Sequence, residues 1–318
     1  MGQTRALHSA GNKSRMSVVS SFIKDVGCNR ALYIMLVPVI LYYAVFRYAP
    51  MYGAIIAFKD FSPGKGIIGS PWVGLTHFKD FITGYYFSRT VINTVLISLY
   101  GLVFSFPAPI ILALMLNEIK NNSFKRTIQT ITYMPHFVSL VVICGIIMEF
   151  TATDGVINDF LVIFGSERTS LMQRPELFRT IYIASGIWQQ VGWGTIIYLA
   201  AISGIDTELY EACTIDGGGR LRQLLHITLP GISSTIVILL ILRMGSIMNV
   251  GFEKIILLYS PATYQTADVI SSFVYRKGLQ EFSFSYSAAV GLFNSAIDFF
   301  LVISANWISK KVNETSLW

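Results

Sequence analysis

One polar stretch near the middle of the chain has the most informative spacing of side chains. Asp206 or Thr207 can cap a helix that begins near Glu208, and the glycine run 217–219 would end or bend that helix. A second short helical stretch then leads into the next apolar run. Small residues beside this turn would let another protein's surface approach closely, so the chemistry they predict is docking. The candidate docking residues are Glu211, Ala212, Cys213, Asp216, Gly217, Ile227, Leu229 and Pro230.

Catalytic, metal and nucleotide sites are not indicated anywhere in the sequence. The four histidines lie in separate loops or helix ends, and the three cysteines fit neither a metal spacing nor a disulfide framework. The glycine run is not a phosphate-binding loop, because G-x-x-x-x-G-K-[ST] does not occur. We therefore expect no catalytic residues, no bound metal or cofactor, and dependence on an ATPase partner for any use of ATP.

Two ionisable residues lie deep inside apolar runs, Arg243 and Asp298. Charges at membrane depth are costly and tend to be functional. One hypothesis is that the two residues neutralise each other, and another is that Arg243 faces a polar path and meets the hydroxyls or carboxylates of a solute. Nearby polar and aromatic residues could line the same path, but helix packing or an interfacial aromatic belt would explain them equally well. The candidate path residues are Trp188, Gln189, Gln190, Trp193, Tyr198, Arg243, Asn249, Glu253, Asn294 and Asp298.

The elements that carry these residues must be membrane helices. Of 318 residues, 53% are hydrophobic and only 13% are charged, and the mean hydropathy is +0.57. A soluble enzyme could not cover so much apolar surface with so few charges. The composition therefore predicts an all-α polytopic membrane protein. We attribute the net charge of +6 to contacts with anionic lipid and to cytoplasmic loops rather than to nucleic acid.

Six segments are apolar and long enough to cross a bilayer, which needs roughly 20 residues per helix. They define a transmembrane domain over residues 30–310, between an N-terminal tail, 1–29, and a C-terminal tail, 311–318. The N-terminal tail could form a helix in the membrane interface or remain disordered. The polar stretch becomes an inner loop, 203–230, between the fourth and fifth spans. The predicted spans are 31–48, 90–116, 128–150, 177–202, 232–258 and 286–308.

The distribution of basic residues predicts the orientation in the membrane. With six spans both termini lie on one side, and that side has twelve Lys and Arg against eight on the other. Cytoplasmic loops are enriched in these residues. We therefore expect a protein of the bacterial inner membrane with both termini on the cytoplasmic side.

The inner loop resembles the signature of binding-protein-dependent ABC importer permeases, which reads E-A-A, three residues, G, nine residues, I-x-L-P. Glu211, Ala212 and Gly217 lie on that spacing, as do the residues of Ile227-Thr228-Leu229-Pro230, while Cys213 replaces the second alanine. The resemblance implies a type I permease fold whose cytoplasmic coupling helix, within residues 206–230, docks on an ATPase dimer that holds ATP-Mg. It also implies a second homologous permease and an extracellular or periplasmic binding protein as partners.

Shorter segments along the chain are similar to permeases of the carbohydrate-uptake branch. They include Trp72-Val73-Gly74-Leu75, Tyr133-Met134-Pro135 and the stretch from Gly251 to Leu279. These last residues resemble permeases for complex polysaccharides and their oligosaccharides, among them the alginate importer. The resemblance therefore implies ATP-driven import of oligo- or polysaccharides, acidic ones included. The alternatives are another solute, a scaffold without transport, or a membrane enzyme, for which no convergent acids or histidines are found.

Overall fold

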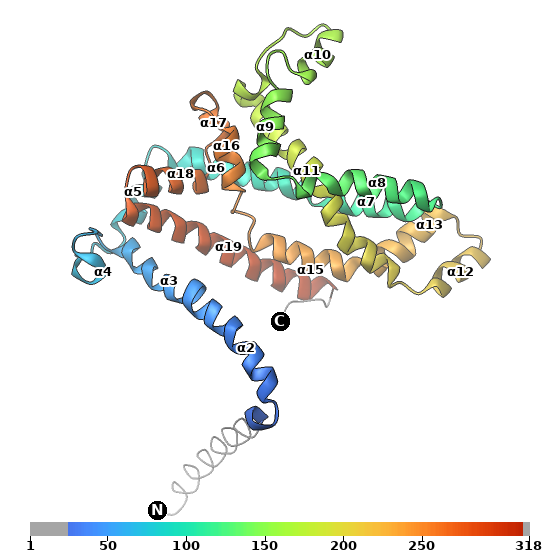
Figure 1. The fold of residues 1–318 in the computed structure, drawn as a ribbon, viewed down its shortest axis with the longest axis horizontal. Helices are drawn as coiled ribbons and strands as arrows, with labels where there is room; N and C mark the ends of the chain where they lie inside the picture. The colour runs from blue at the N-terminus through green and yellow to red at the C-terminus, as the bar shows by residue number, and fades with distance from the viewer. Residues whose placement is uncertain (1–24, 314–318) are drawn as a thin grey trace, which may run out of the picture. The chain divides into compact units, whose positions relative to one another are not determined.

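The computed structural model describes residues 25–313, and these residues are almost entirely helical (Figure 1). The chain separates into two compact units, residues 1–55 and 56–318, which we describe individually. The predicted interfacial helix in the N-terminal tail and most of the C-terminal tail lie outside the described residues. Within residues 25–313 the only β-type pairing is an isolated bridge between Lys59 and Trp72.

The described part of unit one is an apolar helix. The helical run Arg30–Phe58 has 29 residues, so it covers the predicted first span and continues ten residues beyond it. None of the residues of α2 is buried, although almost all are apolar. Such a surface requires lipid or another protein as its surroundings. The run consists of α2 (Arg30–Tyr43), the π-helical turn η1 (Ala44–Tyr48), α3 (Ala49–Met51) and η2 (Tyr52–Phe58).

The second predicted span is one helical run of 32 residues, Phe87–Glu118. A wider turn, in which the Phe106 N–H donates to the Gly101 carbonyl at 3.0 Å, comes directly before Pro107. The proline ring lacks an N–H and would clash with a carbonyl one turn earlier, and the wider turn accommodates it. The run comprises α6 (Phe87–Tyr100), η3 (Gly101–Ser105) and α7 (Pro107–Glu118).

The third predicted span, 128–150, is wrong as a single helix. Two helices meet here at 103°, with the break between Phe137 and Leu140. Pro135 lies in the last turn before the break, and Ser139 caps the next helix through its hydroxyl. A proline followed by a capping serine ends one helix and starts another. The segments are α8 (Asn122–Tyr133), η4 (Met134–Phe137) and α9 (Leu140–Phe150).

The longest helix in the middle of the chain is α11 (Pro175–Ser203), which contains the predicted fourth span. It packs against α7 and α8. Gly192 makes this approach possible, because a Cβ there would collide with the backbone carbonyl of Thr132. Its 29 residues are enough to cross a bilayer, but it is not among the helices apolar enough to span one, since amides and glycines interrupt its apolar residues.

The fifth predicted span, 232–258, is also wrong as one continuous helix. Residues 220–231 and 233–244 form two helices that meet at 55°, and the helix then stops at Met244. The next seven residues, 245–251, form turns or have no regular secondary structure, and the next helix begins after them. Three of these seven residues are apolar and apolar runs lie on both sides of them, so hydropathy alone did not locate the break. The segments are α13 (Arg220–Gln223), η6 (Leu224–Thr228), α14 (Leu229–Gly231), α15 (Ser233–Met244) and α16 (Phe252–Leu258).

The last helix, α19 (Phe284–Asn313), runs beside α15 and contains the sixth predicted span (Figure 1). By length and apolar composition, three described helices could cross a membrane, or five if each bent pair is one span. The loop helices α12 and α13 lie at the opposite end of unit two from α5 and α18 (Figure 1). The remaining segments are α4 (Gly66–Gly69), α5 (Thr76–Ile82), α10 (Val156–Ile163), η5 (Leu171–Gln173), α12 (Thr207–Ile215), η7 (Pro261–Thr263), α17 (Tyr264–Ala267), α18 (Ile270–Tyr275) and η8 (Arg276–Gln280).

Three buried apolar clusters hold unit two together. One joins α9, α11 and α16 around Ile143 and Phe178, a second joins α5, α18 and α19 around Phe81, and a third joins α7 and α11 with Ile232. The side chains at the centres of these clusters are at most 1% exposed: Ile143, Phe178, Phe81 and Ile232. The clusters leave the space between α6, α11 and α15 unfilled.

Candidate functional site

A cavity of about 790 Å³ lies between α6–η3–α7, α11, α15 and the residues that follow α15; we call it the α6–α11–α15 cavity. Its wall mixes apolar side chains with amides, hydroxyls and charged groups. Of the predicted path residues, the structure brings six to this wall: Gln189, Gln190, Tyr198, Arg243, Asn249 and Glu253.

The other four predicted path residues have different surroundings. Trp193 of α11 stacks on His136 of η4 with ring centroids 4.4 Å apart. Trp188, also in α11, is about half exposed. His136 also contacts the Gln190 side-chain oxygen through Nδ1 at 2.9 Å. This stack therefore ties α11 to the break between α8 and α9.

Asn294 and Asp298 of α19 are buried and act on the backbone of the broken fifth segment. The Asp298 carboxylate accepts hydrogen bonds from the Met248 N–H and the Asn249 side-chain amide, both at 2.9 Å. Asn294 donates to the Asn249 side-chain oxygen at 3.3 Å. Asp298 therefore satisfies donors in the non-helical stretch between α15 and α16.

The ion pair hypothesised between Arg243 and Asp298 is not formed. None of the ion pairs found in residues 25–313 includes either side chain. Because α15 ends at Met244, Arg243 lies in its last turn, and its guanidinium reaches Gly101 of η3 across the cavity. Asn249 and Glu253 therefore do not continue the helix that carries Arg243.

Lys254 and the side chains that hold it were missed by the sequence reasoning. Lys254 is 7% exposed, lines the cavity and donates to Ser185 Oγ at 2.9 Å and to the Tyr182 carbonyl at 3.2 Å. A lysine within an apolar span was the available signal. It remained undetected because the expected span placed Lys254 near a helix end, where a lysine can reach water.

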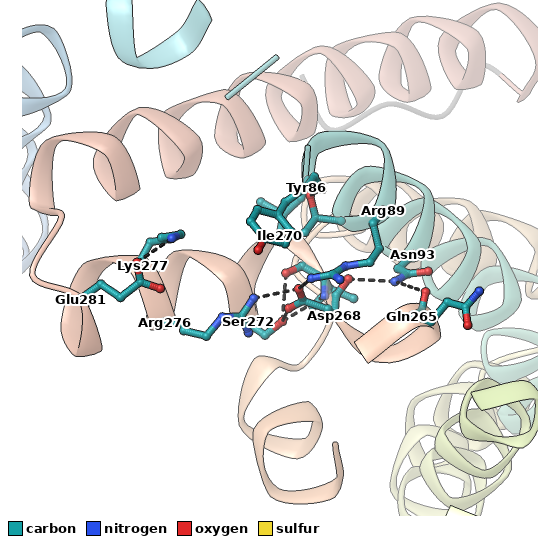
Figure 2. A network of polar contacts seen from close by, with 12 residues as sticks. Tyr86, Arg89, Asn93, Gln265, Asp268, Ile270, Ser272, Arg276, Lys277 and Glu281 are labelled. Carbon is teal, nitrogen blue, oxygen red and sulfur yellow. Dashed lines mark hydrogen bonds and ion pairs between the residues drawn. The ribbon is translucent and has the colours of Figure 1, made fainter. Parts of the chain in front are cut away.

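A second polar network surrounds Asp268, which is fully buried after α17 (Figure 2). Its Oδ2 accepts from Arg89 of α6 at 2.7 Å and from Arg276 of η8 at 2.8 Å, while Oδ1 accepts from Ser272 at 2.9 Å. Asn93 donates to the Asp268 carbonyl at 3.0 Å. Burial by itself would lower the pKa of Arg276, but the hydrogen bond and charge of Asp268 raise it overall.

The same network extends to α11. Arg179 donates to the Asn93 side-chain oxygen at 2.7 Å, and the Ile270 N–H donates to Thr94 Oγ1 at 2.9 Å. Helices α6, α11 and α18 are thereby joined at the end of unit two opposite the inner loop (Figure 1). The sequence alone does not pair Arg179 with Asn93, because the two residues are 86 positions apart.

The inner loop forms a compact pair of helices. Asp206 caps α12 by accepting from the Glu208 N–H at 3.0 Å, as one of the two predicted caps requires. Gly217 has φ +77°, a conformation that favours glycine, and it turns the chain towards α13. Tyr210 and Thr228 hydroxyls are 3.0 Å apart, and they join α12 to η6.

Most of the candidate docking residues belong to the exposed surface of the inner loop. Glu211, Ala212, Asp216, Gly217 and Pro230 are exposed, whereas Cys213, Ile227 and Leu229 are partly buried. The same surface presents large apolar side chains to solvent: Leu209 is 53%, Leu221 71% and Ile215 86% exposed. Exposed apolar residues with a polar rim are typical of a protein-binding surface. Within the described residues, no group of His, Cys, Asp or Glu could hold a metal ion.

Comparisons with known proteins give consistent relatives. Residues 105–314 match the family model described as binding-protein-dependent transport system inner membrane component. The chain is 44% identical to Protein LplB of Bacillus subtilis over 288 residues, which are 90% of this chain and 91% of LplB. It is also 44% identical to the polygalacturonan/rhamnogalacturonan transport system permease protein YteP of the same bacterium, over 90% of each chain.

Solved structures agree with the fold. A crystal structure of a bacterial ABC transporter that imports the acidic polysaccharide alginate contains a chain 41% identical to this one. The match has a TM-score of 0.85 and covers 92% of this chain and 99% of that one. A second structure, of the alginate transporter with a periplasmic protein bound to alginate pentasaccharide, matches over the same shares with a TM-score of 0.86.

Proposed function

We propose, because the chain belongs to the family of binding-protein-dependent transport system inner membrane components, that it is the permease subunit of an ATP-driven importer of oligo- or polysaccharides, acidic ones included. It would form half of the translocation path, together with a second homologous permease. A binding protein would deliver the sugar at the end that carries the Asp268 network. An ATPase dimer, which would hold ATP-Mg, would bind the inner loop. This chain itself would have no ATPase site.

The observation that carries this proposal is the course of residues 220–244. This segment begins within the exposed inner loop, bends by 55° at Ile232, and carries Arg243 in its last turn at the wall of the α6–α11–α15 cavity. Gly231 packs against Ile205 so closely that a Cβ would lie 2.6 Å from Ile205 Cδ1. A displacement of the loop would therefore be passed along packed helices to the cavity wall.

Sugar chemistry suits the lining of this cavity. Gln189, Gln190 and Asn249 supply amides that can both donate to and accept from hydroxyl groups. Tyr182 and Tyr198 supply aromatic rings, which pack on the apolar faces of sugar rings. The polygalacturonan and alginate systems of the relatives support a substrate of this class.

Reconstitution of the complete transporter in proteoliposomes tests the proposal. Glu211→Lys is expected to abolish both sugar uptake and the ATPase stimulation caused by loaded binding protein, because it reverses the charge of a residue on the coupling-signature spacing, which does not include Glu208. Glu208→Lys makes the same charge change one turn away on α12 and is expected to retain most activity. Normal ATPase stimulation in Glu211→Lys would refute the coupling role of the loop.

The orientation of the chain is part of the same proposal. Both termini would lie in the cytoplasm, on the side of the inner loop. A fluorescent protein fused after Trp318 should fold and emit light, since it folds in the cytoplasm, while alkaline phosphatase at the same position should remain inactive. An active phosphatase fusion would reverse the orientation.

A further inference from the structure

We propose that Lys254, assisted by Arg243, binds the carboxylate groups of the sugar inside the α6–α11–α15 cavity and thereby selects acidic saccharides. This inference rests on the proposed function and names the residues that discriminate substrates. It also assigns a role to a buried lysine for which the coupling mechanism has no use.

Lys254 is a buried cation that is hydrogen-bonded but has no counter-ion. Its ammonium donates to Ser185 Oγ and to the Tyr182 carbonyl, and it lies 4.9 Å from the centre of the Tyr182 ring. An ammonium group has three N–H donors, so these two acceptors leave one donor for a ligand. No acidic side chain among residues 25–313 forms an ion pair with it.

Arg243 adds a second cation to the same wall. Its side chain is exposed to the cavity, and Nη2 lies 3.5 Å from the position that a Cβ would take at Gly101. It likewise forms no ion pair with a described residue. The one acid of the lining, Glu253, is exposed and is the neighbour of Lys254 in α16, where adjacent residues point in different directions.

Electrostatics then favours an anionic sugar over a neutral one. A buried charge without a partner is costly, and a carboxylate that arrives in the cavity supplies the missing partner. Hydrogen bonds to charged groups are stronger than those between neutral groups. A neutral sugar of the same shape can occupy the cavity but cannot compensate the ammonium, so the preference for acids arises from Lys254 rather than from cavity size.

The test is direct binding to the purified permease–ATPase complex, measured without the binding protein. Oligogalacturonate is the acidic probe, and its fully methyl-esterified form is the neutral probe with the same rings. Lys254→Met keeps the length of the side chain and removes the charge, and Lys254→Arg keeps the charge. Ser185→Ala is the matched control, because it removes one hydrogen bond of Lys254 and leaves the ammonium in place.

We expect Lys254→Met to weaken oligogalacturonate binding by about tenfold or more, the loss expected for a charge-assisted hydrogen bond. Binding of the methyl ester should change less than about twofold on the same grounds. Lys254→Arg and Ser185→Ala should retain the preference for the acid, and Arg243→Gln should reduce it. Equal losses for both probes in Lys254→Met would assign Lys254 a purely structural role and overturn the inference.

Further outcomes separate this inference from the proposed function. If the wild-type complex binds neither probe or binds both equally, while loaded binding protein still stimulates its ATPase, the transporter role stands and the selection of acids by Lys254 is refuted. If no sugar-loaded binding protein stimulates the ATPase, the proposed function itself fails. The Lys254→Met complex could fail to assemble while Lys254→Arg binds both probes normally. If Arg243→Gln then keeps the full preference for the acidic probe, that result would likewise count against recognition of carboxylates by these two residues.

Discussion

The carboxylate of Asp298 in α19 accepts a hydrogen bond from the backbone N–H of Met248 at 2.9 Å, at the point where α15 has ended and α16 has not begun. The same carboxylate holds the Asn249 side chain at 2.9 Å. A residue that resembles a membrane-buried ion-pair partner therefore stabilises a broken helix. This places Arg243, five residues before Met248, free of Asp298 and at the cavity.

The first prediction concerns this hydrogen bond. Asp298→Leu removes both accepting oxygens and leaves the Met248 N–H unsatisfied, which should cost about 1–3 kcal/mol of stability. Thermal unfolding of the purified complex in detergent would measure the loss. The control is Asp159→Leu in the exposed pair with Arg168, where roughly 0–1 kcal/mol is expected. Equal stability of both variants would mean that the break needs no support from Asp298.

The Asp268 network gives the second prediction. Asp268→Asn deprives the partly buried Arg89 and Arg276 of their shared carboxylate, which is itself fully buried, and breaking a buried pair in this way costs about 3–5 kcal/mol. The yield and the unfolding temperature of the membrane-extracted protein should both fall. Glu281→Gln, which breaks the partly exposed pair with Lys277 nearby, should lower neither measurably (Figure 2). Similar losses from the two variants would contradict the proposal that Asp268 stabilises the fold by pairing with both arginines.

The close approach of α8 to α11 gives the third prediction. Gly192→Ala places a methyl group against the Thr132 carbonyl, and overpacking of this kind costs roughly 1–3 kcal/mol. Gly145→Ala in α9 meets no atom within 4 Å and should be neutral or slightly stabilising, since alanine favours a helix. Unfolding temperatures of the two variants, measured side by side, decide the matter. A stable Gly192→Ala protein would show that α8 shifts freely along α11.

The turn of the inner loop gives the fourth prediction. Gly217→Ala forces a side chain into a backbone with φ +77°, at a cost of about 1 kcal/mol, while Gly219→Ala has open space and φ −81°. Gly217→Ala should therefore weaken the ATPase stimulation caused by loaded binding protein, and Gly219→Ala should preserve it. The two stimulation ratios, measured at equal amounts of assembled complex, are the readout. The reverse order would argue against a role for the turn geometry.

Local patterns carried most of what could be predicted. The cap at Asp206, the turn at Gly217 and the helices on either side follow from residues a few positions apart, and the structure confirms them. The all-helical membrane fold follows from apolar runs that must satisfy their backbone hydrogen bonds internally. Polarity within such runs also indicated Gln189, Gln190 and Arg243, which do line the cavity.

The sequence by itself determined the class of protein and the local geometry of its inner loop, because hydrophobicity, helix caps and positive φ angles depend on neighbouring residues. Only the tertiary structure decided where the fifth segment breaks, what Asp298 binds and which cation lies buried at the cavity. Met248 and Asp298 are 50 residues apart, and Lys254 and Ser185 are 69 apart. Contacts over such separations depend on which helices pack together, and helix periodicity indicates which face is polar but not which partner that face meets.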